Sequence, residues 1–148
     1  MPVRVVDVEE SVALDAAAIA GDIPSRALMR AAAFNAASVI CARYPDQLRR
    51  GATVLTGPGN NGGDGWAVAS ALSAVGVKVT VREVVQARTP DAIAERAQAS
   101  GLISTAPLSC GVVVDAMLGT GGSGELRDAF LDAAREIARA RDGGSAVV

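Results

Sequence analysis

Residues 52–65 read ATVLTGPGNNGGDG, a short apolar run followed at once by a loop that contains five glycines. The run at 52–56 is rich in β-branched residues and predicts a buried strand. Residues 66–75 predict a helix that ends at Gly76, and residues 77–81 predict the next strand. A strand, a glycine loop, a helix and a second strand form a βαβ unit, so we expect the two strands to be parallel.

The alternation of helices and strands extends to both sides of this unit. Apolar spacing predicts helices at 12–20, 25–43, 90–99 and 126–141 and a third strand at 111–116. In the second of these helices, the apolar residues that share one face are Leu28, Ala32, Ala36 and Val39. Strands that alternate with helices of this length predict an α/β fold with a mostly parallel sheet covered on both faces.

Length and composition indicate one domain, residues 1–148, because half of the residues are apolar and can form a real core. The formal net charge is −2 and no cluster of Lys or Arg occurs, so we expect no nucleic-acid or membrane partner. No apolar run approaches the roughly 18 residues that a membrane span needs. The acidic amino terminus lacks a signal-peptide pattern, which predicts a cytoplasmic location.

The chain has no histidine and only two cysteines, Cys41 and Cys110. Each cysteine lies in an apolar stretch, so both are expected to be buried structural thiols. The absence of histidine excludes Ser-His and Cys-His nucleophiles and the commonest transition-metal ligand. Any chemistry must therefore use carboxylates, amides, hydroxyls, backbone groups or a bound ion.

The glycine loop has the spacing of a dinucleotide site. Gly57, Gly59 and Gly62 fit the pattern G-x-G-x-x-G, and Glu83 lies 21 residues after Gly62, where a ribose-binding acid would be expected. Glycines let the backbone approach a pyrophosphate, and the N–H groups at the start of the next helix face it. This spacing alone is typical of a dehydrogenase.

The residues between the glycines change that interpretation. Asp64 is expected at the helix start, where it could cap N–H groups but would also repel a phosphate. The Asn60 and Asn61 amides suit ribose hydroxyls or an oxygen-coordinated cation. The loop is therefore expected to do more than hold phosphate, although a turn with an Asp cap is the simpler alternative.

A second cluster, DAMLGTGGSGE at 115–125, follows the third predicted strand. In an open α/β sheet, ligands bind beyond the carboxyl ends of the strands, so both loops should face one cleft. Asp115 at the strand end is a candidate cation ligand or acid-base group, and a turn carboxylate is the alternative.

The sequence GPGNNGGDG at 57–65, together with Asp115-Ala116 and Gly119-Thr120-Gly121, resembles the NAD(P)HX epimerases, a family also called the YjeF amino-terminal domain. Leu14-Asp15, Ile23-Pro24-Ser25 and Leu28-Met29 resemble the helical amino-terminal segment of that family. The resemblance implies a Rossmann-like three-layer sandwich preceded by that segment, and commonly a homodimer. It also implies interconversion of the R and S forms of hydrated NADH or NADPH, the NAD(P)HX substrate. The product would supply an ADP- or ATP-dependent NAD(P)HX dehydratase, which is separate or fused downstream.

Roles for individual residues follow from the same resemblance. A potassium ion would be coordinated by Asn61 and Asp115, and the candidate catalytic groups for proton transfer or ring opening at C6 are Asp64 and Asp115. The residues expected to contact the substrate are Asn60, Asn61, Gly62, Gly63, Asp64, Gly119, Thr120, Gly121, Gly122, Ser123, Gly124 and Glu125.

The chain departs from the family pattern in three places. Arg30 and Ala33 stand where the family usually has Glu and Gly, and Leu118 and Gly122 replace an aromatic and an aliphatic residue. The family also continues into a strand that ends in Asp-x-Pro-Ser-Gly, whereas residues 146–148 resemble only the opening of a fourth strand. We therefore expect an epimerase domain that lacks its carboxyl-terminal third.

Two alternatives remain open at this point. An NAD(P)-dependent oxidoreductase is permitted by the glycine spacing but fits poorly with Asp64 inside the loop. A catalytically silent nucleotide-binding or protein-interaction module is the other alternative. Nucleotide binding without equilibration of the R and S epimers would favour it.

Overall fold

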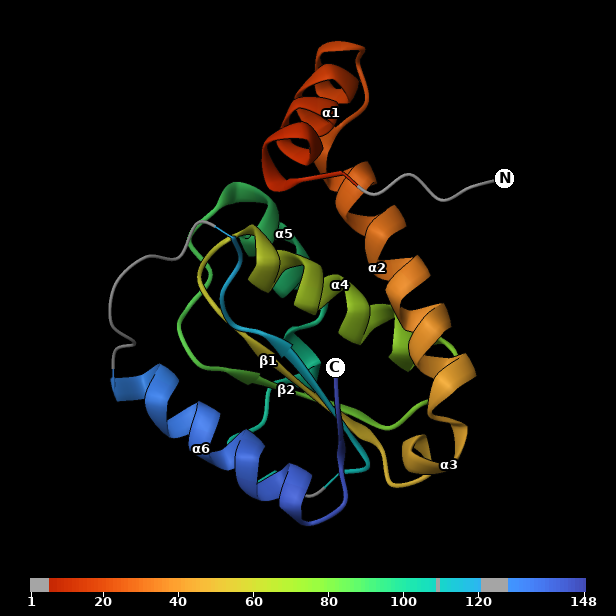
Figure 1. Ribbon diagram of the computed structural model, residues 1–148, viewed down its shortest axis with the longest axis vertical. Coiled ribbons are helices and arrows are strands. Elements are labelled where there is room, and N and C mark those ends of the chain that lie inside the picture. Colours follow the sequence, from red (N-terminus) through yellow and green to blue (C-terminus); the bar gives the residue numbers. More distant parts are fainter. Residues whose placement is uncertain (1–5, 109, 121–127) are drawn as a thin grey trace.

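The computed structural model describes residues 6–108, 110–120 and 128–148 and shows three layers, with a parallel sheet between helices (Figure 1). In this part of the chain the sheet has four strands in the order β2-β1-β3-β4, all parallel. Their bounds are β1 Ala52–Thr56, β2 Val79–Glu83, β3 Val112–Ala116 and β4 Ala146–Val147. The predicted α/β fold and parallel sheet are confirmed.

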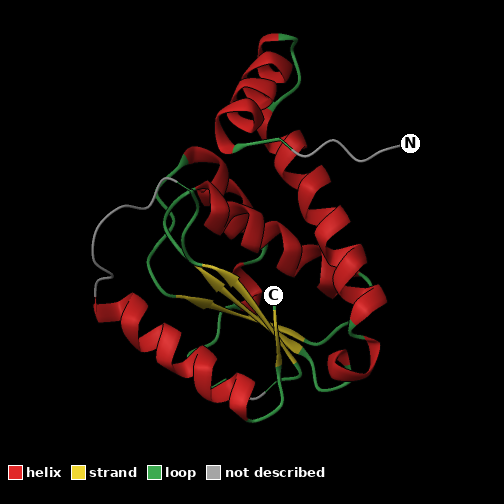
Figure 2. Cartoon of the chain, in the orientation of Figure 1, coloured by secondary structure: helices red, strands yellow, loops and turns green. Residues whose placement is uncertain are grey.

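Helices cover both faces of the sheet (Figure 2). The described helices are α1 Val8–Ala20, α2 Ser25–Arg43, α3 Pro45–Leu48, α4 Asn60–Ala74, α5 Pro90–Gln98, the 3-10 turn η1 Ser100–Leu102, and α6 Asp128–Asp142. Helices α2, α4 and α5 lie on one face, and α6 lies on the other. No helix in the described ranges is both long and apolar enough to cross a membrane.

Two apolar clusters hold the layers together because successive strand residues point to opposite faces. On one face, Val54 and Val112 pack with Trp66 and Leu72 of α4, and all four side chains are fully buried. The cluster on the other face consists of Leu55, Val113, Phe130, Ala133, Cys110 and Met117. The central strands are thus buried on both sides, as their continuous apolar run predicted.

The helix that follows the glycine loop begins at Asn60, six residues before its predicted start. The glycines at 62 and 63 belong to this helix because they permit close packing. A Cβ on Gly62 would lie 2.0 Å from the Gly57 carbonyl oxygen, and one on Gly63 would lie 2.7 Å from the Met29 methyl. The expectation that Asp64 stands at the helix start is wrong, since it is the fifth residue of α4 and Gly59 occupies the N-cap position.

The other boundaries differ from prediction for local reasons. Strand β2 starts two residues later than expected because Gly76, with φ +86°, ends α4 and the Val77 N–H donates to the Leu72 carbonyl. Helix α1 starts earlier, at Val8, where the Asp7 carboxylate caps it by accepting from the Glu10 N–H at 2.8 Å.

The face of α2 that packs on the core differs from the predicted face by one residue. Its buried residues are Met29, Ala33, Ala37 and Ile40, whereas Val39 is 53 % exposed. Ala33, which stands where the family usually has Gly, is therefore a core residue. Both cysteines are free thiols. Cys110 is buried as expected, but Cys41 is only half-buried.

Candidate functional site

The predicted site lies where the strand order changes direction. The chain moves from β1 outward to β2 and then returns to the other side of β1 to form β3, so β1 and β3 are neighbours whose connections leave in opposite directions. Ligands of open α/β sheets bind beyond the carboxyl ends of such a pair. The loops at 57–59 and 117–120 both start there, and they are tied together. Gly57 N–H donates to the Ala116 carbonyl at 3.2 Å, and the Asn61 amide donates to the Leu118 carbonyl at 3.0 Å.

A cavity of about 830 Å³ opens at this edge. Its lining residues come from α1, from the glycine loop with the start of α4, and from the loop after β3: Val6, Asp7, Val8, Ser11, Val12, Asp15, Pro58, Gly59, Asn60, Asn61, Asp64, Met117, Leu118, Gly119 and Thr120. The expectation that the two loops face one cleft is therefore confirmed.

The structure brings together five of the predicted site residues on this cavity, namely Asn60, Asn61, Asp64, Gly119 and Thr120. Gly62 and Gly63 are buried and do not line it. The predicted contacts of Gly121, Gly122, Ser123, Gly124 and Glu125 fall outside the described residues.

The amino end of α4 supplies polar backbone groups to the floor of the cavity. The first intrahelical bond runs from the Gly63 N–H to the Gly59 carbonyl at 3.1 Å, and Gly59 provides no side-chain cap. The N–H groups of the first three residues of a helix have no partner within it, and they carry the positive end of the helix dipole. This geometry suits an anion such as a diphosphate.

Among the carboxyl groups of the described residues, Asp64 has the pKa that is raised furthest above its ordinary value. Burial first, and the negative charge of Asp15 second, raise the pKa of Asp64 to about 6. A carboxyl group with such a pKa exists in both protonation states near neutral pH. Asp64 can therefore donate a proton to a ligand in the cavity and accept one from it.

Asp115 lies apart from this cavity. Its side chain is exposed, and its carboxylate accepts from the Met117 N–H at 3.0 Å, which is the turn role that the sequence left open as the alternative. It lines a separate cavity of about 220 Å³ with Leu118 and, from α6, Phe130. The structure thus does not bring Asp115 and Asp64 together on one cavity, and a catalytic role for Asp115 stays a prediction.

Glu83 has a structural partner in place of the ribose that the dehydrogenase pattern predicts. Its two carboxylate oxygens accept from the Arg96 guanidinium at 2.6 and 2.9 Å, and one of them also accepts from the Ala87 N–H. The Arg96 hydrogen bonds hold the pKa of Glu83 below its ordinary value. The oxidoreductase interpretation therefore loses support, because its expected acid is already engaged.

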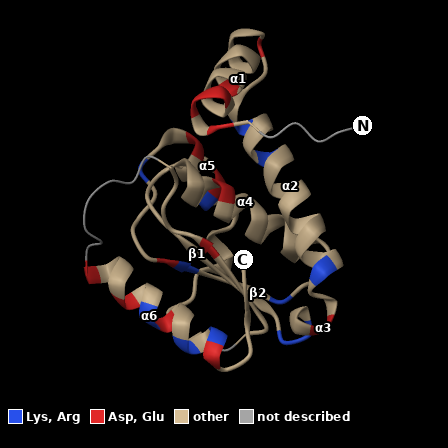
Figure 3. Cartoon of the chain, viewed as in Figure 1, with Lys and Arg blue, Asp and Glu red and all other residues tan. Residues whose placement is uncertain are grey.

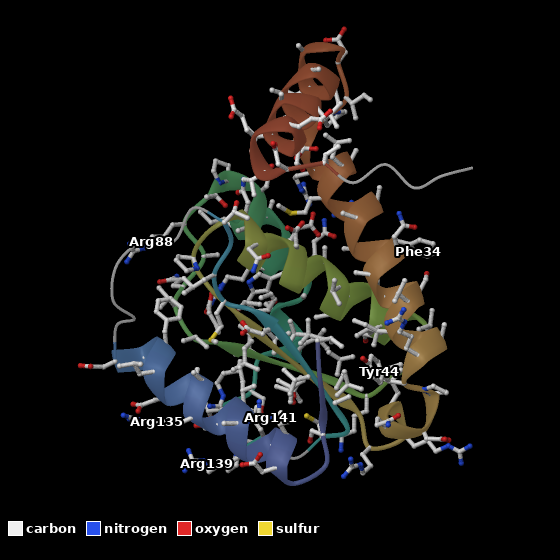
Figure 4. The ribbon with its side chains drawn as sticks, in the orientation of Figure 1. Phe34, Tyr44, Arg88, Arg135, Arg139 and Arg141 are labelled. Atoms are coloured by element: carbon white, nitrogen blue, oxygen red, sulfur yellow. The ribbon has the colours of Figure 1, made fainter. Side chains whose placement is uncertain are left out.

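Two residues at this edge were not singled out as site residues by the sequence. Asp15 lines the cavity from α1, and only the three-dimensional position of that helix reveals that its charge acts on Asp64. Arg88 follows β2, and its N–H donates to the Pro58 carbonyl at 2.8 Å. Its exposed side chain extends away from the sheet (Figure 4). Strand order could have indicated Arg88, since the carboxyl ends of parallel strands share one edge.

The side chains that most often bind metal ions do not form a cluster among the described residues of this site. No group of three or more His, Cys, Asp and Glu side chains placed to hold a metal ion occurs in the described ranges. A cation at this site would therefore depend on amide and backbone oxygens as well as carboxylates, which are the donors that hard ions accept.

Comparisons with known proteins agree with the fold and with the motif. Residues 25–148 match the family model described as YjeF-related protein N-terminus. The chain is 37 % identical over 142 residues to the bifunctional NAD(P)H-hydrate repair enzyme Nnr of Thermanaerovibrio acidaminovorans, a match that covers 86 % of this chain and 27 % of that protein. It is 34 % identical over 123 residues to the NAD(P)H-hydrate epimerase of Limosilactobacillus reuteri, which covers 78 % of this chain and 58 % of that protein.

The fold is also similar to that in the crystal structure of yeast ynu0, with a TM-score of 0.77 and 22 % identity, covering 95 % of this chain and 67 % of that one. The chain thus spans less than two thirds of the length of the two sequence relatives named above. The family model nevertheless covers most of the chain and includes the whole glycine loop. The chain therefore belongs to the family of YjeF-related protein N-terminal domains.

Proposed function

We propose that this domain interconverts the R and S epimers of hydrated NADH or NADPH, as an isomerase in nicotinamide nucleotide repair. The observation that carries the proposal is the cavity of about 830 Å³ on which a helix amino end, two amides and the Asp64 carboxyl meet. Family membership supports the same substrate class, because relatives of the chain are named NAD(P)H-hydrate epimerase.

In this proposal the amino end of α4 binds the diphosphate, and the Asn60 and Asn61 side chains bind sugar hydroxyls. Epimerisation at C6 requires a bond from C6 to oxygen or to the ring nitrogen to open and to close again. In the C6–O route, Asp64 in its acid form protonates the C6 hydroxyl, which leaves as water, and the resulting carboxylate takes a proton from the water that adds to the other face of the ring. In the ring-opening route, Asp64 donates its proton to the ring nitrogen while the C6 hydroxyl passes its proton to solvent and becomes an aldehyde, and closure on the other face of the aldehyde reverses both transfers. Protons and bonds are then the same before and after the reaction.

We also propose potassium as the cofactor, held by Asn61 and Asp115. The Asn61 nitrogen is committed to the Leu118 carbonyl, which leaves its amide oxygen as an acceptor, and Asp115 engages one carboxylate oxygen with Met117. Both residues contact the backbone of the loop after β3 and present oxygen donors, which suit a hard alkali ion, although they line different cavities in this structure. The rate in potassium chloride is expected to exceed the rate in choline chloride at equal ionic strength.

A homodimer and a dehydratase partner complete the proposal. The exposed aromatic ring of Phe34 on α2, whose exposed fraction is 65 %, supports the homodimer (Figure 4). Relatives named bifunctional repair enzymes support a second activity on the same or a separate polypeptide. Light scattering of the wild type and of Phe34→Glu tests the dimer, which the substitution is expected to weaken. We expect the protein to act in the cytoplasm.

The central experiment follows the equilibration of purified R or S NADPHX by chromatography, with and without the domain. The wild type is expected to accelerate it, and Asp64→Asn is expected to lower the rate by 100-fold or more, the usual size of a lost acid-base group, about 10²–10⁴. Asp46→Asn is the matched control, because Asp46 lies on α3 and is 87 % exposed.

Two outcomes would contradict the proposal. Equal rates for the wild type and Asp64→Asn would remove Asp64 from the reaction. Binding of NADPHX without any acceleration would favour a nucleotide-binding module instead.

A further inference from the structure

Helix α1 is attached to the rest of the molecule in an unusual way, because none of its residues is buried. In Figure 1 it stands beyond the end of α2, beside α4 and α5. Its exposed apolar side chains include Val8 at 54 %, Val12 at 61 % and Leu14 at 55 %. A helix with this little buried surface gains little from packing, so its position is determined mainly by the turn that connects it to α2.

That turn has the features of a hinge. Gly21 is the C-cap of α1, Asp22 has a left-handed φ of +66°, and Pro24 is the N-cap residue of α2. A few residues at the end of an element can absorb the backbone rotation by which a domain or helix closes. The Asp22 and Ile23 N–H groups donate to the Ile19 and Ala18 carbonyls, so most of the turn is joined to α1, and rotation of α1 relative to α4 would fall on the link between Ile23 and Pro24.

The inner face of α1 encloses open space. The cavity of about 830 Å³ and a second one of about 470 Å³ between α1 and α2 share four lining residues, which are Val12, Asp15, Asn60 and Asp64. The two cavities are thus parts of one gap beneath the helix. This gap continues from the amino end of α4, where the diphosphate is proposed to bind.

The charge of this gap indicates which part of a ligand lies against α1. Asp15 and Asp64 line both cavities, and no Lys or Arg is among the described residues that line either one. Figure 3 shows acidic residues on α1 close to the body of the molecule. Directly beside Asp15 a phosphate would be repelled, whereas the hydroxyls of a ribose can donate hydrogen bonds to its carboxylate; the diphosphate is proposed instead at the free N–H groups of α4 on the same cavity.

We propose that α1 is a hinged wall of the nucleotide site, which closes on the uncharged sugar-and-base part of a dinucleotide. Val12 packs against that part, and Asp15 accepts hydrogen bonds from its ribose hydroxyls. Both residues therefore determine specificity at the end of the ligand that lies away from the diphosphate. This inference rests on the proposed function, since NADPHX is the ligand considered.

Hydrogen exchange of the amides of α1 and α4, measured with and without saturating NADPHX, tests the closure. In the free protein the amides of α1 are expected to exchange faster than those of α4, because nothing on α1 is buried. NADPHX is expected to slow exchange in both helices. Equal protection of α1 and α4 in the free protein would overturn the inference.

Two matched pairs of variants test the contacts through the dissociation constant of NADPHX. Val12→Ser and Asp15→Asn are each expected to weaken binding by about fivefold, the size of one lost apolar or charge-assisted contact. Leu14→Ser and Glu9→Gln, which change residues of α1 that line neither cavity, are expected to stay within about twofold. Circular dichroism checks that all four variants keep the helix.

The outcomes separate this inference from the proposed function. Protection of α4 alone, or tighter binding by Asp15→Asn, would overturn the closing wall and leave nucleotide binding intact. A loss of affinity as large in the control variants as in Val12→Ser and Asp15→Asn would overturn it as well. Protection of neither helix would contradict the proposed function and the inference together.

Discussion

Three glycines of the GPGNNG segment have different structural roles: Gly57 and Gly62 at its two ends, and Gly59 between them. Gly62 is buried, and a Cβ there would meet the Gly57 carbonyl oxygen at 2.0 Å, far inside contact distance. Gly57 is equally constrained, since its Cβ would lie 1.8 Å from the Met117 carbonyl oxygen. Gly59 has open space around it and an extended backbone with φ −94°. The motif therefore combines packing positions with one position that faces the cavity.

Gly62→Ala is expected to destabilise the domain by about 3 kcal/mol, because overpacking against backbone cannot be relieved by a side-chain rotation. Urea unfolding followed by the fluorescence of Trp66, the one tryptophan of the chain, measures the change. Gly59→Ala is the control and is expected to lower the free energy of unfolding by about 1 kcal/mol or less, because Gly59 has open space around it but is the N-cap of α4, where Gly is preferred to Ala. Equal effects of the two substitutions would contradict the steric assignment.

At the scale of elements, a buried acid links α2 to α5. Glu95 of α5 is only 2 % exposed, and one of its carboxylate oxygens accepts from Arg26 at 2.9 Å and from Arg30 at 2.8 Å. Arg30, which stands where the family usually has Glu, thus has a structural role in this chain. Its guanidinium also donates to Gln98 at 2.7 Å.

Loss of both arginines is expected to be costly because the Glu95 carboxylate would remain buried without a partner. Arg26→Ala with Arg30→Ala should lower the free energy of unfolding by about 3 kcal/mol, and adding Glu95→Gln should recover part of that loss. Arg49→Ala is the control, since Arg49 and Asp46 are both more than 80 % exposed and such pairs contribute little. Denaturant unfolding of the wild type, the double variant, the triple variant and Arg49→Ala measures these free energies of unfolding. An unchanged stability in the double variant would show that the contacts are incidental.

Helices and strands were predictable where their signals are local. The run at 52–56 and the helix at 25–43 agree with the structure to the residue, because β-branched residues and Pro mark their ends. The start of α4 was not predictable from propensity. Glycines usually break helices, and only the packing of Gly62 against another loop makes them favourable there.

The candidate site, like the helices and strands, was predictable from the sequence only in part. The glycine loop and Asp64 were found from their spacing, and the cavity confirms that Asn60, Asn61 and Asp64 meet. The contribution of α1 depends on how a helix with no buried residue is placed, and that placement has no periodic signal in the sequence. Long-range contacts of this kind become visible only in three dimensions.

For the whole molecule, the acidity of Asp64 links stability to pH. Its pKa rises from 3.8 to about 6 on folding, so the folded protein binds this proton more tightly than the unfolded chain does. The stability that Asp64 contributes is therefore fully present below about pH 4 and is lost as the pH rises through about 6. Glu83 makes the opposite contribution to the pH dependence of stability. The ion pair with Arg96 lowers the pKa of Glu83, so the stability that Glu83 contributes is lost as the pH falls.

Comparison of the wild type with Asp64→Asn isolates this effect, since the other titrating groups are common to both proteins and cancel in the difference. The variant is expected to gain stability relative to the wild type between about pH 4 and pH 7, because it never has to hold a charge in the half-buried site beside Asp15. Urea unfolding at several pH values measures the difference. Glu83→Gln is expected to show a loss at neutral pH that shrinks in acid. A difference between Asp64→Asn and wild type that stays constant across this range would mean that folding does not alter the acidity of Asp64, and its assignment as the proton-transfer group would then lose its physical basis.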